Sequence, residues 1–188
     1  MDKRQRMLFA AADLFTSQGI QHTSTAAISR HAGVATGTLF NYFASKDQLI
    51  EELYDHSCES MMAATSLDSI DTRDYRKAFD LLWYRGITWG CENPKLFWFL
   101  EEITRSAYRA RDDTHIRWLS LDPVKDFIAE GVSRGRIRDI PVNLIHTMIM
   151  STISGIVAEV LVNGADRELY IGESRQIVWK ALAVDEGA

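Results

Sequence analysis

The fold of this 188-residue chain is decided by residues 33–49, which read GVATGTLFNYFASKDQL. Gly33 allows a tight turn between two helices, because glycine adopts left-handed backbone angles at little cost. Leu39 and Phe43 follow one helical turn apart on one face. Ser45 and Gln48 form the capping-box pattern that opens a further helix. The stretch therefore predicts a short helix held between a tight turn and the start of a longer helix.

The residues before this stretch complete a small helical motif. Asp2 is a suitable cap for a first helix that runs to about Gln18, with a glycine directly after it. Thr23 or Ser24 caps a second, shorter helix, which Gly33 ends. Two short helices around a glycine turn, supported by a longer first helix, are typical of a helix-turn-helix.

Helix signals continue to the end of the chain, without the period-two alternation of strands. The fourth helix is expected from about Ser45 to Met62. Later helices are expected to begin near Asp71, Pro94, Pro123, Pro141 and Asp166, and Gly164 is expected to end the helix that begins at Pro141. The prediction is an all-α fold of about nine helices. A helix-turn-helix domain is expected over residues 1–48, and a helical ligand-binding and dimerisation domain over residues 49–188.

Composition excludes several other classes of protein. The net charge is −5, but residues 1–50 carry five basic and three acidic side chains, so the acidic excess lies in the rest of the chain. Cys58 and Cys91 have no second cysteine at metal-ligand spacing, and the five histidines are scattered. No catalytic constellation, metal or cofactor is therefore expected. The basic N-terminus does not read as a signal peptide, and polar residues interrupt the apolar run 145–162, so we expect a cytoplasmic protein without a membrane span.

Residues 4–54 resemble the DNA-binding segment of the TetR family of transcriptional regulators. The resemblance lies in four elements that occur in one register: the glycine-valine turn at position 33, the sequence Gly37-Thr38-Leu39, the pair Tyr42-Phe43, and serine-lysine-acidic at position 45. It implies a DNA-binding transcriptional regulator, which we expect to bind a near-palindromic operator as a homodimer because one short recognition helix reads few bases. It also implies a small-molecule effector.

The resemblance implies three kinds of DNA contact. Residues at the start of the second and third helices would meet phosphate, outward side chains of the third helix would meet bases, and basic residues would add electrostatic attraction. Two departures from the family pattern are Ala35-Thr36, where serine and a cation are common, and Asn41, where histidine is common. The residues expected to contact DNA are Thr25, Thr36, Gly37, Thr38, Phe40, Asn41, Tyr42, Lys46, Arg4 and Arg6.

Aromatic side chains concentrate between positions 79 and 118. The resemblance implies an effector pocket in this part of the chain, and aromatic walls with an acidic group suit a small hydrophobic or cationic-aromatic ligand. The alternative is ordinary core packing, which is the commoner use of large aromatics. The residues expected to line the pocket are Trp83, Trp89, Phe97, Trp98, Glu101, Tyr108 and Trp118.

The last two helices are expected to form the dimer interface, because small residues between positions 151 and 158 permit close helix approach. Together these features predict a repressor that its ligand releases from the operator. Three alternatives remain open at this point: an activator, an enzyme that uses the aromatic pocket, and a DNA-binding or protein-interaction module without a ligand.

Overall fold

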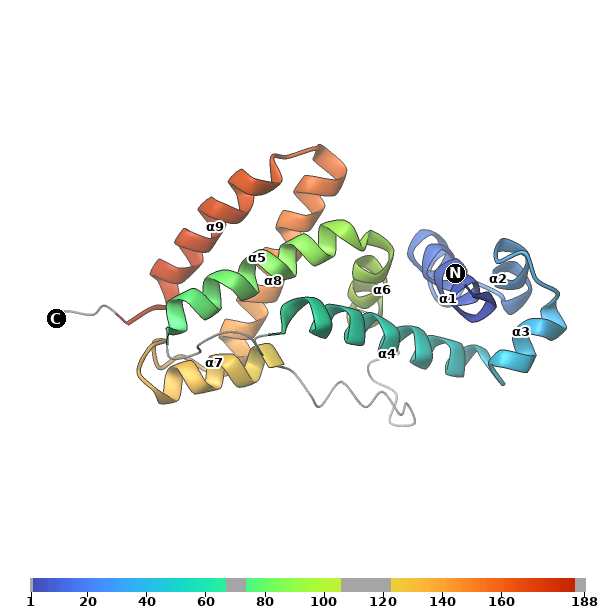
Figure 1. Cartoon of the computed structure of the whole chain (residues 1–188), viewed down its shortest axis with the longest axis horizontal. Coiled ribbons are helices and arrows are strands. Elements are labelled where there is room, and N and C mark those ends of the chain that lie inside the picture. Colours follow the sequence, from blue (N-terminus) through green and yellow to red (C-terminus); the bar gives the residue numbers. More distant parts are fainter. Residues whose placement is uncertain (1, 67–73, 106–122, 185–188) are drawn as a thin grey trace. The chain divides into compact units, whose positions relative to one another are not determined.

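The computed structural model describes the chain apart from residues 1, 67–73, 106–122 and 185–188 (Figure 1). The described residues form nine helices and no sheet, which confirms the predicted fold class. They fall into two compact units. One comprises the described residues within Met1–Ser60 and Asn93–Trp118, and the other those within Met61–Glu92 and Leu119–Ala188. The boundary expected between residues 48 and 49 is a division by function and stays a prediction.

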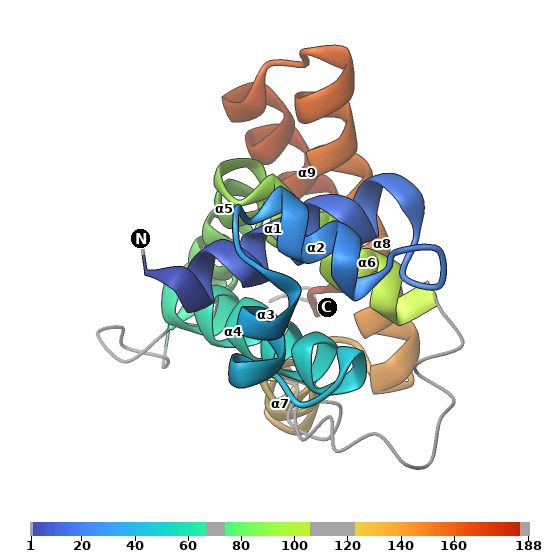
Figure 2. The same ribbon diagram turned by 90° about the vertical axis from the view of Figure 1, so that its right-hand side faces the viewer.

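The first unit contains the helix-turn-helix (Figure 2). Its side chains pack into one apolar core, in which Leu8, Ile28, Leu39 and Phe43 are at most 1% exposed. A helix from much later in the sequence, α6, joins this core through Phe99, whose ring stacks on that of Phe15 with centroids 5.9 Å apart. The helices of this unit are α1 (Lys3–Gln18), α2 (Thr25–His31), α3 (Thr36–Tyr42), most of α4 (Lys46–Thr65) and α6 (Pro94–Arg105).

The first helices begin and end at the residues that the sequence indicates. Asp2 and Gln5 form a reciprocal capping box at the start of α1, and Gly19 ends α1 with a φ of +83°. Ser24 caps α2, since its hydroxyl accepts from the Ala27 amide at 3.1 Å. Gly33 makes the turn before α3 with a φ of +67°, a conformation that favours glycine.

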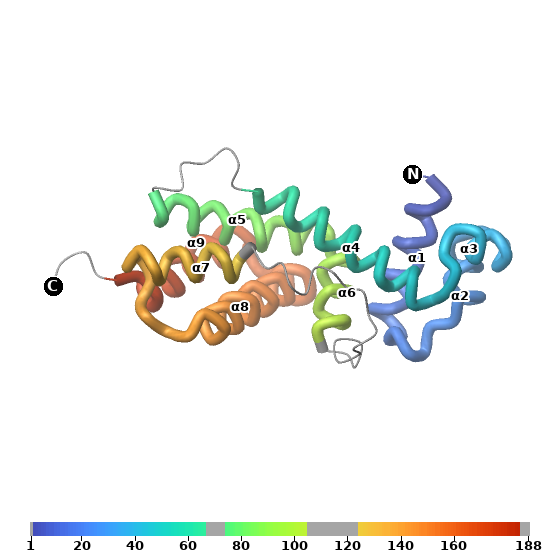
Figure 3. The backbone as a smooth tube through the Cα atoms, turned by 90° about the horizontal axis from the view of Figure 1, so that it is seen from below, coloured from blue at the N-terminus to red at the C-terminus, as the bar shows by residue number. Residues whose placement is uncertain are grey.

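The second unit is built around α8, which contacts α5, α7 and α9 (Figure 3). Asp74 caps α5 through a hydrogen bond from the Lys77 amide at 3.0 Å, and the predicted cap Asp71 lies outside the described residues. Gly164 ends α8 in the left-handed conformation, and Asp166 caps the last helix, both as predicted. The helices of this unit are α5 (Tyr75–Glu92), α7 (Pro123–Ser133), α8 (Val142–Asn163) and α9 (Arg167–Leu182).

A close helix contact in the second unit depends on a glycine of α7. The Tyr75 ring stacks on Phe127 with centroids 4.2 Å apart, and its hydroxyl donates to the Phe127 carbonyl oxygen. This arrangement brings the ring against Gly131: an added Cβ would lie 2.5 Å from Cζ of Tyr75 and 2.9 Å from Cδ1 of Ile137. The absence of a side chain at position 131 therefore lets α5 approach α7.

Gly131→Ala is expected to destabilise the protein by about 1–3 kcal/mol, because the added methyl group overpacks a well-filled contact. A chain of this size should lose roughly 2–4 °C in Tm for each kcal/mol. Gly86→Ala is the matched control, since an added Cβ there would make an ordinary 3.8 Å contact with Ile153. Thermal unfolding followed by circular dichroism makes the comparison, and equal Tm values for the two variants would contradict the assigned role of Gly131.

Candidate nucleic-acid interface

The short helix α3 has one buried face and one exposed face. Leu39 is fully buried, and so is Phe43, which follows the last residue of the helix. Between them Phe40 is 47% exposed and Tyr42 is 42% exposed, and Asn41 is exposed as well. Leu39 and Phe43 anchor the helix in the core of the first unit. The side chains of Phe40, Asn41 and Tyr42, which lie between them in the sequence, are therefore exposed. This is the geometry that a recognition helix requires.

Exposure of two aromatic residues on a seven-residue helix needs a reason. Large apolar side chains usually gain free energy by leaving water, so Phe40 and Tyr42 are candidates for contact with a binding partner. Phe40 offers an apolar surface that fits a thymine methyl group. Tyr42 offers a ring together with a hydroxyl that can donate to phosphate.

Gly37 lies in the first turn of α3 and is exposed. Its backbone is outside the left-handed region, and apart from its chain neighbours and the backbone of α3 itself, no heavy atom of the described residues lies within 4 Å of a Cβ built there. Neither backbone conformation nor packing within the described structure therefore explains why this position is glycine. A glycine inside a helix is less stable than alanine by roughly 0.5–1 kcal/mol. Close approach of a binding partner to the backbone would explain it.

The remaining predicted residues surround α3 within the same unit. Thr25 is the first residue of α2 and is half-buried, and Thr36 is the exposed first residue of α3. Thr38 is half-buried, and Arg6 is half-buried on α1. Their predicted DNA contacts stay predictions, since the structure places them around one helix but contains no DNA.

Lys46 and Arg4 already have partners within the protein. The Lys46 amine donates to the Ile20 carbonyl oxygen and lies 5.9 Å from the centroid of the Phe15 ring. Desolvation by burial lowers the pKa of this amine, while the neighbouring Asp47 acts in the opposite direction. Arg4 forms an ion pair with Glu52. A phosphate contact by either residue would therefore compete with an internal one.

The predicted effector residues divide between the two units. Trp83 and Trp89 are buried in α5 of the second unit, where the Trp83 ring nitrogen donates to the Ser174 hydroxyl at 3.0 Å. Phe97, Trp98 and Glu101 belong to α6 of the first unit, where Phe97 is buried and the other two are half-buried. Tyr108 and Trp118 lie outside the described residues. The pocket stays a prediction.

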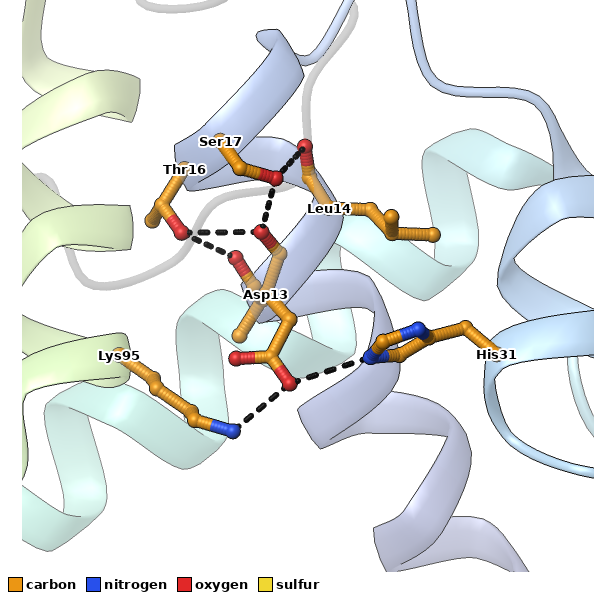
Figure 4. A network of polar contacts seen from close by, with 7 residues as sticks. Asp13, Leu14, Thr16, Ser17, His31 and Lys95 are labelled. Carbon is orange, nitrogen blue, oxygen red and sulfur yellow. Dashed lines mark hydrogen bonds and ion pairs between the residues drawn. The ribbon is translucent and has the colours of Figure 1, made fainter.

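A polar junction on the first unit was missed by the sequence reasoning (Figure 4). The Asp13 carboxylate of α1 accepts from the Lys95 amine of α6 at 2.7 Å and lies 3.3 Å from Nε2 of His31 on α2. The signal was present, because Asp13 is the one charged residue in the apolar, alanine-rich stretch 7–15 of the sequence. Its partners come from positions 18 and 82 residues away, which local patterns do not reveal.

Comparison with known proteins agrees with this interface. Residues 8–53 match the family described as bacterial regulatory proteins, tetR family. An HTH-type transcriptional regulator of Haemophilus influenzae is 30% identical over 82 residues, which span 41% of this chain and 44% of that relative. The HTH-type transcriptional repressor KstR2 of Mycolicibacterium smegmatis is 26% identical over 162 residues, 80% of this chain and 75% of the relative.

A solved structure extends the similarity to the whole chain. A protein of Shewanella sp. PV-4 assigned to the tetR family of transcription regulators superposes with a TM-score of 0.79 at 28% identity, over 98% of this chain and 100% of that one. The family match covers the helix-turn-helix, and the superposition covers the helices that follow it. The matched segment is therefore a helix-turn-helix of the TetR family, and the chain as a whole has the fold of a tetR-family transcription regulator.

Proposed function

We propose that the protein is a cytoplasmic, homodimeric repressor that binds a near-palindromic operator and leaves it when a small ligand binds. The observation that carries the proposal is the exposed Asn41, flanked by two exposed aromatic residues on a helix that Leu39 anchors in the core. Asparagine can make two hydrogen bonds with the edge of adenine in the major groove. The name of the M. smegmatis relative, a transcriptional repressor, supports repression over activation.

A dimer is supported by the apolar surfaces of α8 and α9. Helix α8 is 22 residues long and apolar enough to cross a membrane by length and composition, yet only 22% of its most apolar window is buried. In a protein without a membrane span, a second copy would cover this surface under twofold symmetry. The exposed large apolar residues of the two helices are Leu144, Met148, Leu161, Val162, Leu169, Tyr170 and Ile177.

Ile177→Glu is expected to convert the dimer to a monomer at micromolar concentration, because a glutamate at a 66% exposed position would become a buried, unpaired charge in the interface. Ala129→Glu introduces the same charge at an exposed position of α7, outside the proposed interface, and should leave the dimer intact. Sedimentation velocity measures both variants. A wild-type protein that sediments only as a monomer would contradict the dimer.

Operator recognition requires the dimer, since one seven-residue helix reads few bases. Two recognition helices related by a twofold axis would contact half-sites roughly 34 Å apart, one turn of DNA, or a multiple of it. Hydroxyl-radical footprinting on bound DNA tests this geometry. Two protected half-sites at that spacing support the proposal, and a single protected patch would contradict it.

The effector is proposed to be a small hydrophobic or cationic-aromatic molecule, on the basis of the aromatic side chains that concentrate between positions 79 and 118 of the sequence. Helix α4 is the candidate element for transmission, because it runs from residues of the first unit into residues of the second. The coupling needed is about 1–3 kcal/mol, which changes operator affinity about 5–150-fold. A compound that raises the Tm of the protein but leaves operator affinity unchanged would contradict this part of the proposal.

A further inference from the structure

We propose that Glu52 is a positioning residue for base recognition by α3. Together with Gln48 it connects the first turn of α1 to the corner between α3 and α4, residues 43–45. The inference rests on the proposed function, because it concerns how α3 is held for DNA binding. It gives Arg4 a role inside the protein, where the family resemblance implied a contact with DNA.

The connection is a chain of polar contacts in the first unit. The Arg4 guanidinium pairs with Oε2 of Glu52, and Oε1 of Glu52 accepts from Nε2 of Gln48 at 2.9 Å. Oε1 of Gln48 in turn accepts from the backbone amide of Ala44 at 2.7 Å. Both carboxylate oxygens of Glu52 and both ends of the Gln48 amide are therefore used. Such a chain fixes the orientation of each member.

The chain ends at the corner between α3 and α4. Ala44 lies between Phe43, which caps the end of α3, and Ser45, which caps the start of α4. The Ser45 hydroxyl accepts from the backbone amide of Gln48 at 3.1 Å. In an ordinary capping box the side chain of the third helical residue would bond to the amide of the cap itself. Here the Gln48 side chain bonds one residue earlier, to the segment that leaves the recognition helix.

Arg4 also lies close to the first residue of this corner. Its guanidinium carbon lies 5.9 Å from the centroid of the Phe43 ring, which is fully buried. A cation at this distance from an aromatic ring is attracted to the ring. The residue after α3 is thus held through its ring by Arg4, and the next amide is held by Gln48. The exposed Asn41 and Tyr42 directly precede this held segment.

A stabilising role alone does not account for the arrangement. The Arg4 and Glu52 side chains are 47% and 22% exposed, and ion pairs at such positions contribute little to global stability. Operator affinity is more sensitive than global stability, because a small displacement of α3 would move its side chains away from the bases that they contact. We therefore expect removal of Glu52 to change operator affinity more than Tm.

The test compares Glu52→Gln with Glu51→Gln in fluorescence anisotropy titrations of the full-length protein. Both changes remove one negative charge from the same turn of α4, so their general electrostatic effects on DNA binding are matched. The probes are a duplex that the wild type selects from random DNA and a scrambled duplex of equal length. Relative to Glu51→Gln, Glu52→Gln is expected to lower affinity for the selected duplex about fivefold. Affinity for the scrambled duplex and the salt slope should stay the same.

The opposite outcome identifies a rival role for Glu52. If Glu52 merely keeps Arg4 from a phosphate, Glu52→Gln will bind both duplexes at least as tightly as Glu51→Gln, with a salt slope steeper by about one. That result would overturn the proposal. Circular dichroism and thermal unfolding on each variant separate these outcomes from a folding defect.

A second variant tests the path through Gln48. Gln48→Met keeps the length of the side chain but removes both of its hydrogen bonds, and it should produce a similar loss of affinity for the selected duplex. Combined with Glu52→Gln, it should add little, since both changes break one chain of contacts. Fully additive losses would overturn the proposal. A wild-type protein that selects no sequence would instead contradict the proposed function itself.

Discussion

Gly37→Ala is expected to leave the folded protein as stable as the wild type, or more stable by roughly 0.5–1 kcal/mol, while it lowers operator affinity about 5–150-fold. Stability should not fall, because outside the backbone of α3 and the two chain neighbours no heavy atom of the described residues lies within 4 Å of the added Cβ, and the backbone there is not left-handed. Affinity should fall, because a methyl group on the first turn of α3 would meet the DNA backbone where the helix approaches it.

The two readouts together make this prediction specific. Thermal unfolding reports the effect on folding, and anisotropy titration reports the effect on DNA binding. Gly86→Ala, in α5 of the second unit, is the control for a helical glycine that the proposal does not place against DNA. Equal operator affinities for Gly37→Ala and the wild type would show that the DNA backbone does not approach Gly37.

Asn41→Ala is expected to relax sequence preference at one position of each half-site. If Asn41 bonds to an adenine edge, its loss removes about 1–3 kcal/mol of discrimination, which is about 5–150-fold between the preferred base and its competitors. Affinity for unrelated sequences should change little, because Asn41 is uncharged and non-specific binding is mainly electrostatic. The measurement is affinity for the selected duplex and for the three single-base variants at each half-site position.

Thr25→Ala is the matched contrast for this experiment. Thr25 is expected to contact phosphate from the start of α2, so its loss should weaken binding to all of these duplexes by a similar factor and leave the preference unchanged. An Asn41→Ala protein with the wild-type preference at every position would remove Asn41 from base readout.

Local features of the fold could be predicted from the sequence because single residues determine them. Asp2, Gly19 and Gly164 end or begin helices at the predicted places, since caps and left-handed turns depend on a few neighbouring side chains. The predictions were less accurate where several neighbouring residues could act as the cap or the end of a helix. Helix α4 continues to Thr65 beyond the expected Met62, and Ser24 rather than Thr23 caps α2, because the Thr23 hydroxyl bonds to the Leu14 and Gly19 carbonyl oxygens.

Contacts between distant parts of the sequence could not be predicted in this way. The aromatic residues of α6 indicate a pocket or core packing, but nothing local shows that Phe99 stacks on Phe15 in the unit of the helix-turn-helix. At the candidate nucleic-acid interface, too, local features could be predicted and contacts between distant residues could not. The exposed face of α3 follows from the spacing of Leu39 and Phe43, whereas the pairing of Arg4 with a residue 48 positions away does not.

Base recognition by α3 within a twofold-symmetric dimer can be measured by selecting bound sequences from random duplex DNA, at a stated salt concentration and without added ligand. We expect enrichment of an inverted repeat whose half-site centres are about one helical turn apart, or a multiple of it. Retention of DNA without enrichment of any sequence, by a protein shown to be folded and dimeric, would contradict base recognition by α3.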